Sequence, residues 1–235
     1  MTEPLAVIVP TRGRPGNAAR LAEAFRETHA LDAVPVFVAD WDDPKLPAYR
    51  KLLEDESIPR LLVVDGGTGR GMTRALNYAA RRYAELYEAV GFMGDDHIPR
   101  TANWDSRIME ELDSLDPRIV YGNDLFQGAA LPTAVFMQSR MVLALGFMAP
   151  EVLRHLYVDN YWKELGERTD GLRYLPDVII EHVHPAAGKT PMDDGYRRVN
   201  APEVDDGDRR AWLAYRDGEG FASALKIVHR EYGRG

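Results

Sequence analysis

The stretch Ala89-Val90-Gly91-Phe92-Met93-Gly94-Asp95-Asp96-His97 combines a short apolar run with two adjacent acids. Residues 89–93 predict a buried strand, because a run of this length and character suits a strand covered on both faces. The carboxylates of Asp95 and Asp96 follow directly, and burying them costs free energy unless something neutralises them. A hard divalent cation held against phosphate oxygens would do so, whereas the alternative is a capped turn with exposed acids. The stretch therefore favours a metal site.

Upstream of this stretch, apolar runs alternate with helical patterns. Strands are expected at 5–9, 34–39 and 61–64, and helices near 17–25, 44–53 and 72–83. We expect Asn17 to cap the first of these helices and Pro44 to lie in the first turn of the second. Such alternation predicts an α/β fold with a mixed, mostly parallel sheet flanked by helices.

Downstream of residue 97 the pattern is less regular. Strands are expected at 119–121, 134–137 and 178–183, with helices capped by Thr101, beginning at Ser139 and surrounding Asp159. From residue 188 the chain becomes polar, and helices are expected near 208–215 and 221–232. We therefore predict one domain over residues 1–187 and a C-terminal helical extension over residues 188–235, packed on that domain.

The composition argues against several classes of protein. A formal net charge of −8 disfavours a strongly basic, non-specific nucleic-acid binder. The sequence contains no cysteine, so it has neither a disulfide framework nor a thiolate zinc site. No apolar run approaches the roughly 20 residues of a membrane-spanning helix, and the first residues lack the pattern of a signal peptide. We expect a cytoplasmic protein without a membrane span.

The loop after the first strand carries groups that suit a nucleotide. In parallel sheets, ligands bind beyond the carboxyl ends of the strands. Pro10-Thr11-Arg12-Gly13-Arg14-Pro15 lies at such an end and offers a hydroxyl, two guanidiniums and a helix N-terminus. These groups suit a nucleotide base and a diphosphate. A polar turn with solvated arginines is the alternative.

A glycine-rich loop, Asp65-Gly66-Gly67-Thr68-Gly69-Arg70-Gly71, follows the third expected strand. Its glycines allow the backbone to approach a ligand closely. The spacing is not G-x-G-x-x-G, and the lysine of a P-loop is missing, so a nicotinamide-type site is disfavoured. A nucleotide-contacting loop is favoured over a flexible turn because of the neighbouring segments.

Two later segments carry further candidate groups. In Tyr157-Val158-Asp159-Asn160-Tyr161-Trp162, one acid lies among aromatic residues, where it could act as a general base; helix capping is the alternative. In Glu181-His182-Val183-His184-Pro185, the two histidines alternate and should point to the same face of a strand. One or both could bind the same metal as the aspartates, although surface histidines are common.

Taken in order, these segments resemble family 2 of the glycosyltransferases. The resemblance covers roughly residues 5–185 and rests on the order and spacing of short motifs. The matching segments are Val7 to Pro15, Asp40, Gly71 to Asn77, Phe92 to His97, Leu145-Gly146-Phe147, Val158-Asp159 and Pro176 to His184. Two motifs differ from the family pattern: Gly94-Asp95-Asp96 stands in place of Asp-X-Asp, and Val158-Asp159 in place of Glu-Asp.

The resemblance implies a GT-A, Rossmann-like nucleotide-binding fold and a hexosyltransferase activity. Such an enzyme moves a sugar, with inversion, from a nucleoside diphosphate sugar, most often a UDP-sugar, to an acceptor hydroxyl. It implies Mn²⁺ or Mg²⁺ as cofactor, with Asp96 and His184 as ligands, and Asp159 as the catalytic base. The donor-binding residues that it implies are Pro10, Thr11, Arg12, Arg14, Asp40, Gly67, Arg70 and Asp95, of which Asp95 would contact the ribose.

The sequence leaves other functions open. A sugar-nucleotide pyrophosphorylase would need a Gly-rich run with a lysine after the first strand, which Pro10-Thr11-Arg12 lacks. A non-catalytic nucleotide-sugar-binding module would have no need for Asp159. The acceptor is expected to be a carbohydrate or small molecule, with a hydroxylated base in DNA as a minority alternative. A base could stack on one of five aromatic residues, Trp104, Tyr121, Phe126, Tyr161 and Trp162.

Overall fold

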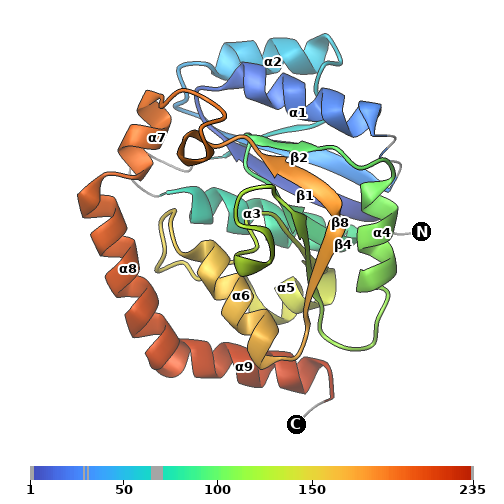
Figure 1. Ribbon diagram of the computed structural model, residues 1–235, viewed down its shortest axis with the longest axis vertical. Coiled ribbons are helices and arrows are strands. Elements are labelled where there is room, and N and C mark those ends of the chain that lie inside the picture. Colours follow the sequence, from blue (N-terminus) through green and yellow to red (C-terminus); the bar gives the residue numbers. More distant parts are fainter. Residues whose placement is uncertain (1–2, 29, 31, 65–70, 234–235) are drawn as a thin grey trace.

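The computed structural model describes residues 3–28, 30, 32–64 and 71–233. The strands in these residues form one sheet (Figure 1). This sheet has eight strands in the order β3-β2-β1-β4-β7-β6-β8-β5. Their bounds are β1 Glu3–Thr11, β2 Ala33–Asp40, β3 Leu61–Val64, β4 Tyr87–Phe92, β5 His97–Pro99, β6 Ile119–Asn123, β7 Val135–Gln138 and β8 Leu172–His182. Four strand pairs are parallel, β1–β2, β1–β4, β2–β3 and β6–β8, and the other three are antiparallel. The predicted mixed, mostly parallel sheet is confirmed.

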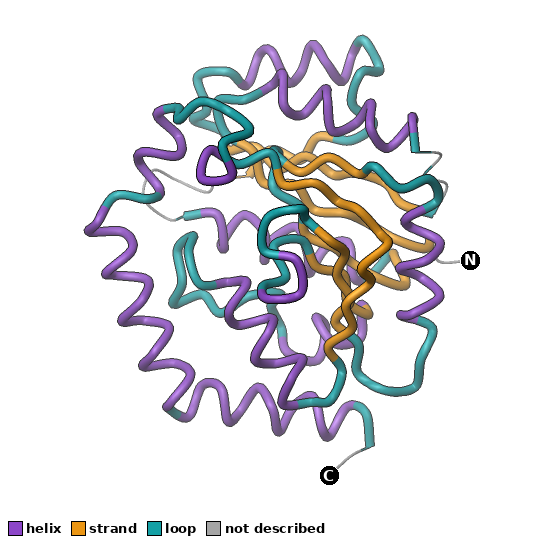
Figure 2. The backbone as a smooth tube through the Cα atoms, in the orientation of Figure 1, coloured by secondary structure: helices purple, strands orange, loops and turns teal. Residues whose placement is uncertain are grey.

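Helices cover both faces of this sheet (Figure 2). Their bounds are α1 Pro15–Glu27, α2 Leu46–Glu54, α3 Met72–Ala84, α4 Trp104–Leu112, α5 Ser139–Leu145, α6 Val158–Arg168, α7 Asp194–Val199, α8 Pro202–Asp217 and α9 Glu219–Glu231. Two short 3-10 helices, η1 Gly128–Ala130 and η2 Pro185–Ala187, follow β6 and β8. The predicted α/β fold is thus present, with helices on the two sides of the strands.

The side chains of β1 alternate between two buried cores. Leu5, Val7 and Val9 face the core formed with α1, α2 and α4. Ala6 and Ile8 face the core formed with α3, α5 and α6. Successive side chains of a strand point to opposite faces, so a strand covered on both sides reads as a continuous apolar run. This packing fixes the carboxyl end of β1, and with it the loop that begins at Thr11.

Three predicted helix starts were wrong. α1 begins at Pro15, so Asn17 lies inside the helix and its side chain reaches Asp95 instead of a backbone N–H. α2 begins at Leu46, because residues 41–45 form a turn that contains Pro44. Thr101 does not cap α4; its hydroxyl donates to the Asp177 carbonyl and accepts from the Ile179 amide, which ties it to β8. For Asn17 and Thr101, a partner from another segment replaces the local cap.

The C-terminal helices wrap one side of the molecule. In Figure 1, α7, α8 and α9 follow one another from the loops near α1 and α2 to the opposite end. Trp212, Phe221 and Val228 are at most 5% exposed and lie in the same core as Tyr161 of α6. The extension therefore contributes apolar side chains to the core of the α/β unit. The division at residues 187 and 188 stays a proposal.

Four of the five aromatic residues considered as base-stacking groups belong to the core. Trp104, Tyr161 and Trp162 are 0% exposed, and Tyr121 is 3% exposed. Burial of this extent leaves no ring face for a base, so the stacking interpretation was wrong for these four. Phe126 is 40% exposed. Among the residues that the structure describes, we find no helix with the length and apolar character needed to cross a membrane.

Candidate functional site

The polar loops that follow β1, β2 and β4 meet at one edge of the sheet. These three strands run parallel to one another, so their carboxyl ends lie on the same side. Thr11 ends β1 and residues 12–14 follow it, Asp40 ends β2 and residues 41–43 follow it, and residues 93–96 follow β4. The loop with Gly67 and Arg70 lies outside the described residues, and Pro10 is part of β1, where it pairs with Val38.

Arg12 is fixed between two carboxylates of the β2 loop. Its Nη1 lies 3.0 Å from Asp40 Oδ2 and 2.6 Å from Asp42 Oδ1. The hydrogen bond to Asp42 raises the pKa of Arg12 above its ordinary value. Burial raises the pKa of Asp40, and Arg12 opposes this rise. The Gly13 amide donates to Asp43 at 2.8 Å, so the two loops are held together at both residues.

A chain of hydrogen bonds links the β1 loop to Asp95. The Arg14 amide donates to the Tyr49 hydroxyl at 2.8 Å, and that hydroxyl lies 2.9 Å from Thr11 Oγ1. Thr11 donates its proton to Asp95 Oδ2 at 2.6 Å, so Tyr49 must donate to Thr11. Burial raises the pKa of Tyr49 to about 12, which keeps the phenol protonated. Tyr49 was missed from the sequence, where it looks like an apolar-face residue of α2.

Asp95 is buried, and three side chains of the first loop and α1 surround it. Besides Thr11, Arg14 Nη1 lies 3.3 Å and Asn17 Nδ2 3.4 Å from Asp95 Oδ1. Burial and the charge of Asp96 raise the pKa of Asp95 to about 6, while the hydrogen bond from Thr11 works against that rise. Both oxygens of Asp95 therefore have protein donors. Its assigned ribose contact stays a prediction.

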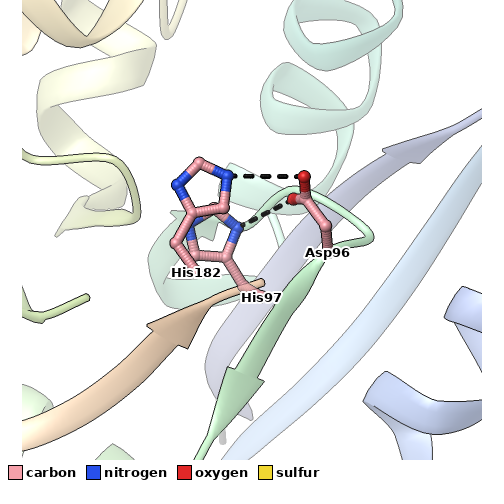
Figure 3. Close-up of side chains that lie close together, drawn as sticks. All are labelled: Asp96, His97 and His182. Carbon is pink, nitrogen blue, oxygen red and sulfur yellow. Dashed lines mark ion pairs between the residues drawn. The ribbon is translucent and has the colours of Figure 1, made fainter. Parts of the chain in front are cut away.

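Asp96 faces two stacked imidazoles (Figure 3). His182 Nε2 is 3.3 Å from Asp96 Oδ2, and His97 Nδ1 is 3.4 Å from Oδ1. The Tyr196 hydroxyl donates to Oδ2 at 2.7 Å. Burial alone would raise the pKa of Asp96, but the contacts with His182 and His97 together outweigh it, and this pKa lies well below the ordinary value. Asp96 is thus an ionised carboxylate in a confined polar site.

The two imidazoles differ in their hydrogen bonds. His97 and His182 stack with ring centres 4.3 Å apart. The Gly94 amide donates to His97 Nδ1 at 3.0 Å, and His97 Nε2 lies 3.4 Å from the Thr133 hydroxyl. Thr133 gives its own proton to Asp124 at 2.8 Å, so it accepts from His97, whose Nε2 carries the hydrogen. Burial lowers the pKa of His97, which favours this neutral form.

His182 has a ring nitrogen to spare. Its Nδ1 is buried, has no hydrogen-bond partner among the described residues, and lies 4.0 Å from Asp124 Oδ2. Asp96, His97 and His182 each offer one ligand atom, and these atoms lie within 4.8 Å of one another. His97 uses both of its nitrogens in hydrogen bonds. Asp96 and His182 are therefore the favoured pair for a metal ion, with Nε2 of His182 as the ligand atom beside Asp96 and the ring hydrogen on the unpartnered Nδ1.

Asp124 organises the loop beside these histidines and was missed from the sequence. Its Oδ1 accepts from the amides of Phe126, Gln127 and Gly128 at 2.7–2.9 Å. Burial would raise the pKa of Asp124, but these amides and Thr133 lower it below the ordinary value. Its position directly after β6 was a signal that could have found it, since aspartates at strand ends often bind nearby amides.

His184 lies next to the cluster and not within it. β8 ends at His182, so the strand alternation expected for the two histidines does not extend to His184. His184 Nδ1 accepts from the Ala186 amide at 3.1 Å, and its ring packs edge-on against Tyr196 with centres 4.9 Å apart. The structure thus places His182, and not His184, directly against Asp96. The ligand role of His184 stays a prediction.

Asp159 lies in the first turn of α6, as expected, with a half-buried carboxylate. Burial raises the pKa of Asp159, and the nearby charge of His182 lowers it. A carboxylate with a raised pKa holds a proton more strongly, which suits a base. Among the residues that the structure describes, its carboxylate accepts a hydrogen bond from the Asn160 amide at 3.1 Å.

The segment before α6 is held by distant residues. Asp208 of α8 accepts from the amides of Arg154, His155 and Leu156 at 2.8–3.0 Å. Thr73, at the start of α3, donates its amide to the Arg154 carbonyl at 3.2 Å. The loop that leads to Asp159 is therefore fixed from both α3 and α8.

The helix α7 reaches the site from the C-terminal extension. Arg14 Nη2 donates to Asp193 at 2.7 Å, and the guanidinium lies over the Tyr196 ring at 3.9 Å. Burial would lower the pKa of Arg14, but Asp193 and Asp95 raise it above the ordinary value. Neither Asp193 nor Tyr196 was a candidate from the sequence, because nothing in their spacing indicates contact with residues 14 and 96.

No family model matches the sequence, and no curated protein matches it. Solved structures do match. The mannosyltransferase PcManGT from Pyrobaculum calidifontis, in complex with GDP-Man and Mn²⁺, has a TM-score of 0.61 and 14% identity over 98% of this chain and 74% of its own. TarS from S. aureus, in complex with UDP, has a TM-score of 0.59 and 13% identity over 98% and 71%.

A third match is glucosyl-3-phosphoglycerate synthase from Mycobacterium tuberculosis, in complex with Mg²⁺ and UDP. It has a TM-score of 0.56 and 9% identity, over 99% of this chain and 80% of its own. Identities this low carry the fold alone. The strand order, the helices on both faces and these likenesses agree: the chain has the GT-A fold of the nucleotide-diphospho-sugar transferases.

Proposed function

We propose that this protein is a metal-dependent glycosyltransferase that moves a sugar from a nucleoside diphosphate sugar to an acceptor hydroxyl. The observation that carries the proposal is the ionised Asp96 beside His182. Both residues lie at the same edge of the sheet as the loop that contains Arg12 and Arg14. The structurally similar transferases crystallised with UDP, GDP-Man, Mn²⁺ and Mg²⁺ support it.

The loops after β1 and β2 would hold the donor. Asp40, fixed by Arg12, would contact the base, with a UDP-sugar as the favoured donor. Asp95 would contact the ribose, and Arg14 would contribute positive charge near the diphosphate. Thr11 would support this arrangement through its bond to Asp95.

The residues at the proposed metal site fit a divalent cation. Asp96 stays ionised because its pKa is held low. His182 Nε2 faces Asp96 and could bind the cation, because the ring hydrogen could be carried by the unpartnered Nδ1 on the side of Asp124. A carboxylate with an imidazole suits Mn²⁺ well, whereas Mg²⁺ prefers oxygen ligands and water. Asp96 and His182 would hold the ion, with His184 close enough to be tested as a further ligand. A bound ion would stabilise the negative charge that grows on the departing diphosphate.

Asp159 would act as the base. It would accept the proton of the acceptor hydroxyl while the hydroxyl oxygen attacks the anomeric carbon from the face opposite the diphosphate. One C–O bond forms, the bond to the diphosphate breaks, and the anomeric configuration inverts. The raised pKa of Asp159 favours its taking the proton.

The test is a thermal-shift and hydrolysis screen. UDP, GDP and dTDP are each added with and without Mn²⁺, followed by the matching sugar nucleotides with release of nucleoside diphosphate as the readout. We expect one nucleotide to stabilise the protein, more strongly with Mn²⁺, and its sugar form to be slowly hydrolysed. Absence of stabilisation by all three nucleotides would contradict the proposal.

A further inference from the structure

We propose that α7 is a gate over the donor site, in which Tyr196 and Asp193 occupy the two groups that a metal-bound diphosphate would use. The Tyr196 hydroxyl donates a hydrogen bond to the carboxylate of Asp96, and the Asp193 carboxylate accepts one from the guanidinium of Arg14. This inference rests on the proposed function for the identity of the ligand. The gate itself follows from contacts within the chain.

The contact at Asp96 competes with a cation. The Tyr196 hydroxyl donates to Asp96 Oδ2 at 2.7 Å, the same oxygen that lies 3.3 Å from His182 Nε2. Oδ2 thus has two protein partners, and it is the oxygen nearest the proposed imidazole ligand. A cation bound between Asp96 and His182 needs the lone pairs that these donors now face. Binding the cation therefore exchanges the phenol hydrogen bond for a metal–oxygen contact.

The contact at Arg14 competes with an anion. Asp193 accepts from Arg14 Nη2 at 2.7 Å, while the Tyr196 ring covers the guanidinium at 3.9 Å. A phosphate group offers the same kind of partner as the Asp193 carboxylate, so it could replace that carboxylate without leaving Arg14 unpaired. The cation would thus replace the hydrogen-bond donor at Asp96, which is the Tyr196 hydroxyl. The phosphate would replace the hydrogen-bond acceptor at Arg14, which is the Asp193 carboxylate.

The construction of α7 suits movement as a unit. It is six residues long, and Asp193 caps it by accepting from the Tyr196 amide at 2.9 Å. Half of its residues are exposed, and its buried side chain is Tyr196 itself. Short helices have little stability of their own and depend on tertiary contacts. In contrast, α8 is anchored by Trp212 and Asp208, so α7 can leave the site while α8 stays in place.

The gate predicts that the first ligand to bind eases the entry of the second. Both ligands displace the same helix, so whichever binds first removes an obstacle for the other. Cation and nucleotide should therefore bind with positive coupling, in addition to their direct attraction for each other. Substitutions that loosen α7 should strengthen binding of each ligand alone and reduce the coupling that passes through the helix.

The experiment measures the affinity for Mn²⁺ alone, by calorimetry or by electron paramagnetic resonance. The proteins compared are wild type, Tyr196→Phe, Asp193→Asn and the control Tyr232→Phe. Tyr232 is a suitable control because it follows α9 directly and its hydroxyl donates to Gln138 Oε1, at the end of β7, at 2.6 Å. Tyr196→Phe should bind Mn²⁺ about five- to tenfold more tightly, since no hydrogen bond to a carboxylate has to be broken. Tyr232→Phe should match wild type.

Hydrogen exchange gives a second readout that is independent of activity. Mn²⁺ should speed amide exchange in residues 194–199 of wild-type protein, and Asp193→Asn should exchange fast there without any metal. Unchanged Mn²⁺ affinity in Tyr196→Phe, absence of Mn²⁺ binding to both proteins, or slower exchange in α7 with Mn²⁺ would each overturn the gate.

Titrations with UDP and GDP separate the gate from the proposed function. If Mn²⁺ displaces α7 but no nucleotide binds, the gate stands and the transferase proposal fails. If Mn²⁺-dependent hydrolysis of a sugar nucleotide is found while Tyr196→Phe binds Mn²⁺ as wild type does, the transferase proposal stands and the gate fails.

Discussion

Asp159 is the side chain on which the proposed reaction depends most directly. Replacing it with Asn keeps the size and the bond from the Asn160 amide but removes the group that takes a proton. We expect Asp159→Asn to lower the rate of transfer by about 100-fold or more, while the affinity for nucleotide stays unchanged.

The measurement is turnover of the sugar nucleotide identified by the screen, together with nucleotide binding by calorimetry. Asp177→Asn is a control, because Asp177 is an exposed acid paired with Arg107 on the surface. Normal turnover by Asp159→Asn would remove the base assignment, and loss of nucleotide affinity would move Asp159 into the donor site.

His155 should make the stability of the fold depend on pH. Burial lowers its pKa from 6.5 to about 4, although the nearby acids Asp208 and Asp96 oppose this shift. Above pH 6.5, the imidazole is neutral in both the folded and the unfolded chain, so it contributes nothing. Between about pH 6.5 and 4, the unfolded chain binds the proton more readily, so the free energy of unfolding falls as the pH falls.

We expect this effect to reach on the order of 1–2 kcal/mol by pH 5, measured by urea unfolding at several pH values. In His155→Gln the loss of stability on acidification should be smaller by that amount. The comparison with wild type cancels contributions from other groups, including Asp95, whose raised pKa has the opposite effect. Equal pH dependence in the two proteins would show that His155 is protonated equally in the folded and unfolded chains.

Several side chains of the site could be predicted from the sequence. Those that could not be predicted contact residues that are far away along the chain. Asp95, Asp96 and Asp159 were found because each lies next to an apolar strand or an aromatic segment. Tyr196 contacts Asp96 across 100 residues, and Asp208 contacts His155 across 53. Spacing along the chain carries no information about such contacts, since they depend on how the whole chain packs.

Among the helices and strands, apolar periodicity was a good guide and local capping was a poor one. The strands at 61–64 and 119–121 and the helix from Ser139 were recognised, because their apolar residues pack fully or in part against the two cores. Asn17 and Thr101 were misjudged as caps because their polar groups bond to Asp95 and to β8. The helix α7 was not expected, since its few residues show no apolar period.

The start of α3 depends on a glycine. Gly71 has φ of 79°, and a Cβ at this position would lie 2.2 Å from the Arg154 carbonyl oxygen. Ala would therefore introduce backbone strain and push against the loop that leads to α6. We expect Gly71→Ala to lower the free energy of unfolding by about 2 kcal/mol or more, and also to lower transfer, because that loop positions Asp159.

Gly207 in α8 is a matched control for this substitution. A Cβ at Gly207 meets no atom within 4 Å, and the residue is exposed within a helix. Gly207→Ala should therefore stabilise the protein, by up to about 1 kcal/mol. Urea unfolding measures the free energy of unfolding of both variants. If both substitutions changed it equally and in the same direction, the close approach of Gly71 to the Arg154 carbonyl would be contradicted.

Taken as a unit, the chain depends on its C-terminal helices for the shape of the site. Asp208 is 3% exposed and satisfies three amides of the loop before α6. Asp208→Ala leaves these amides without their acceptor, and we expect the free energy of unfolding to fall by about 2–4 kcal/mol. Asp206→Ala on the same helix removes only surface ion pairs and should leave the unfolding midpoint nearly unchanged.

The measurement for this pair is chemical unfolding followed by tryptophan fluorescence and by circular dichroism. If the extension is part of one cooperative unit, the two signals should shift together in Asp208→Ala, since Trp212 lies in the main core. Separate transitions would show that residues 188–235 unfold independently of the α/β unit.

The contact between Tyr196 and Asp96 also sets an order of events during synthesis. The two residues are 100 positions apart. At translation rates of about 5–20 residues per second, Asp96 is made about 5–20 s before Tyr196. For that interval the growing polypeptide has its aspartates and no phenol to cover Asp96. The proposed imidazole ligand His182 is also made late in that interval, so the cation site and the helix that covers it are completed close together in time.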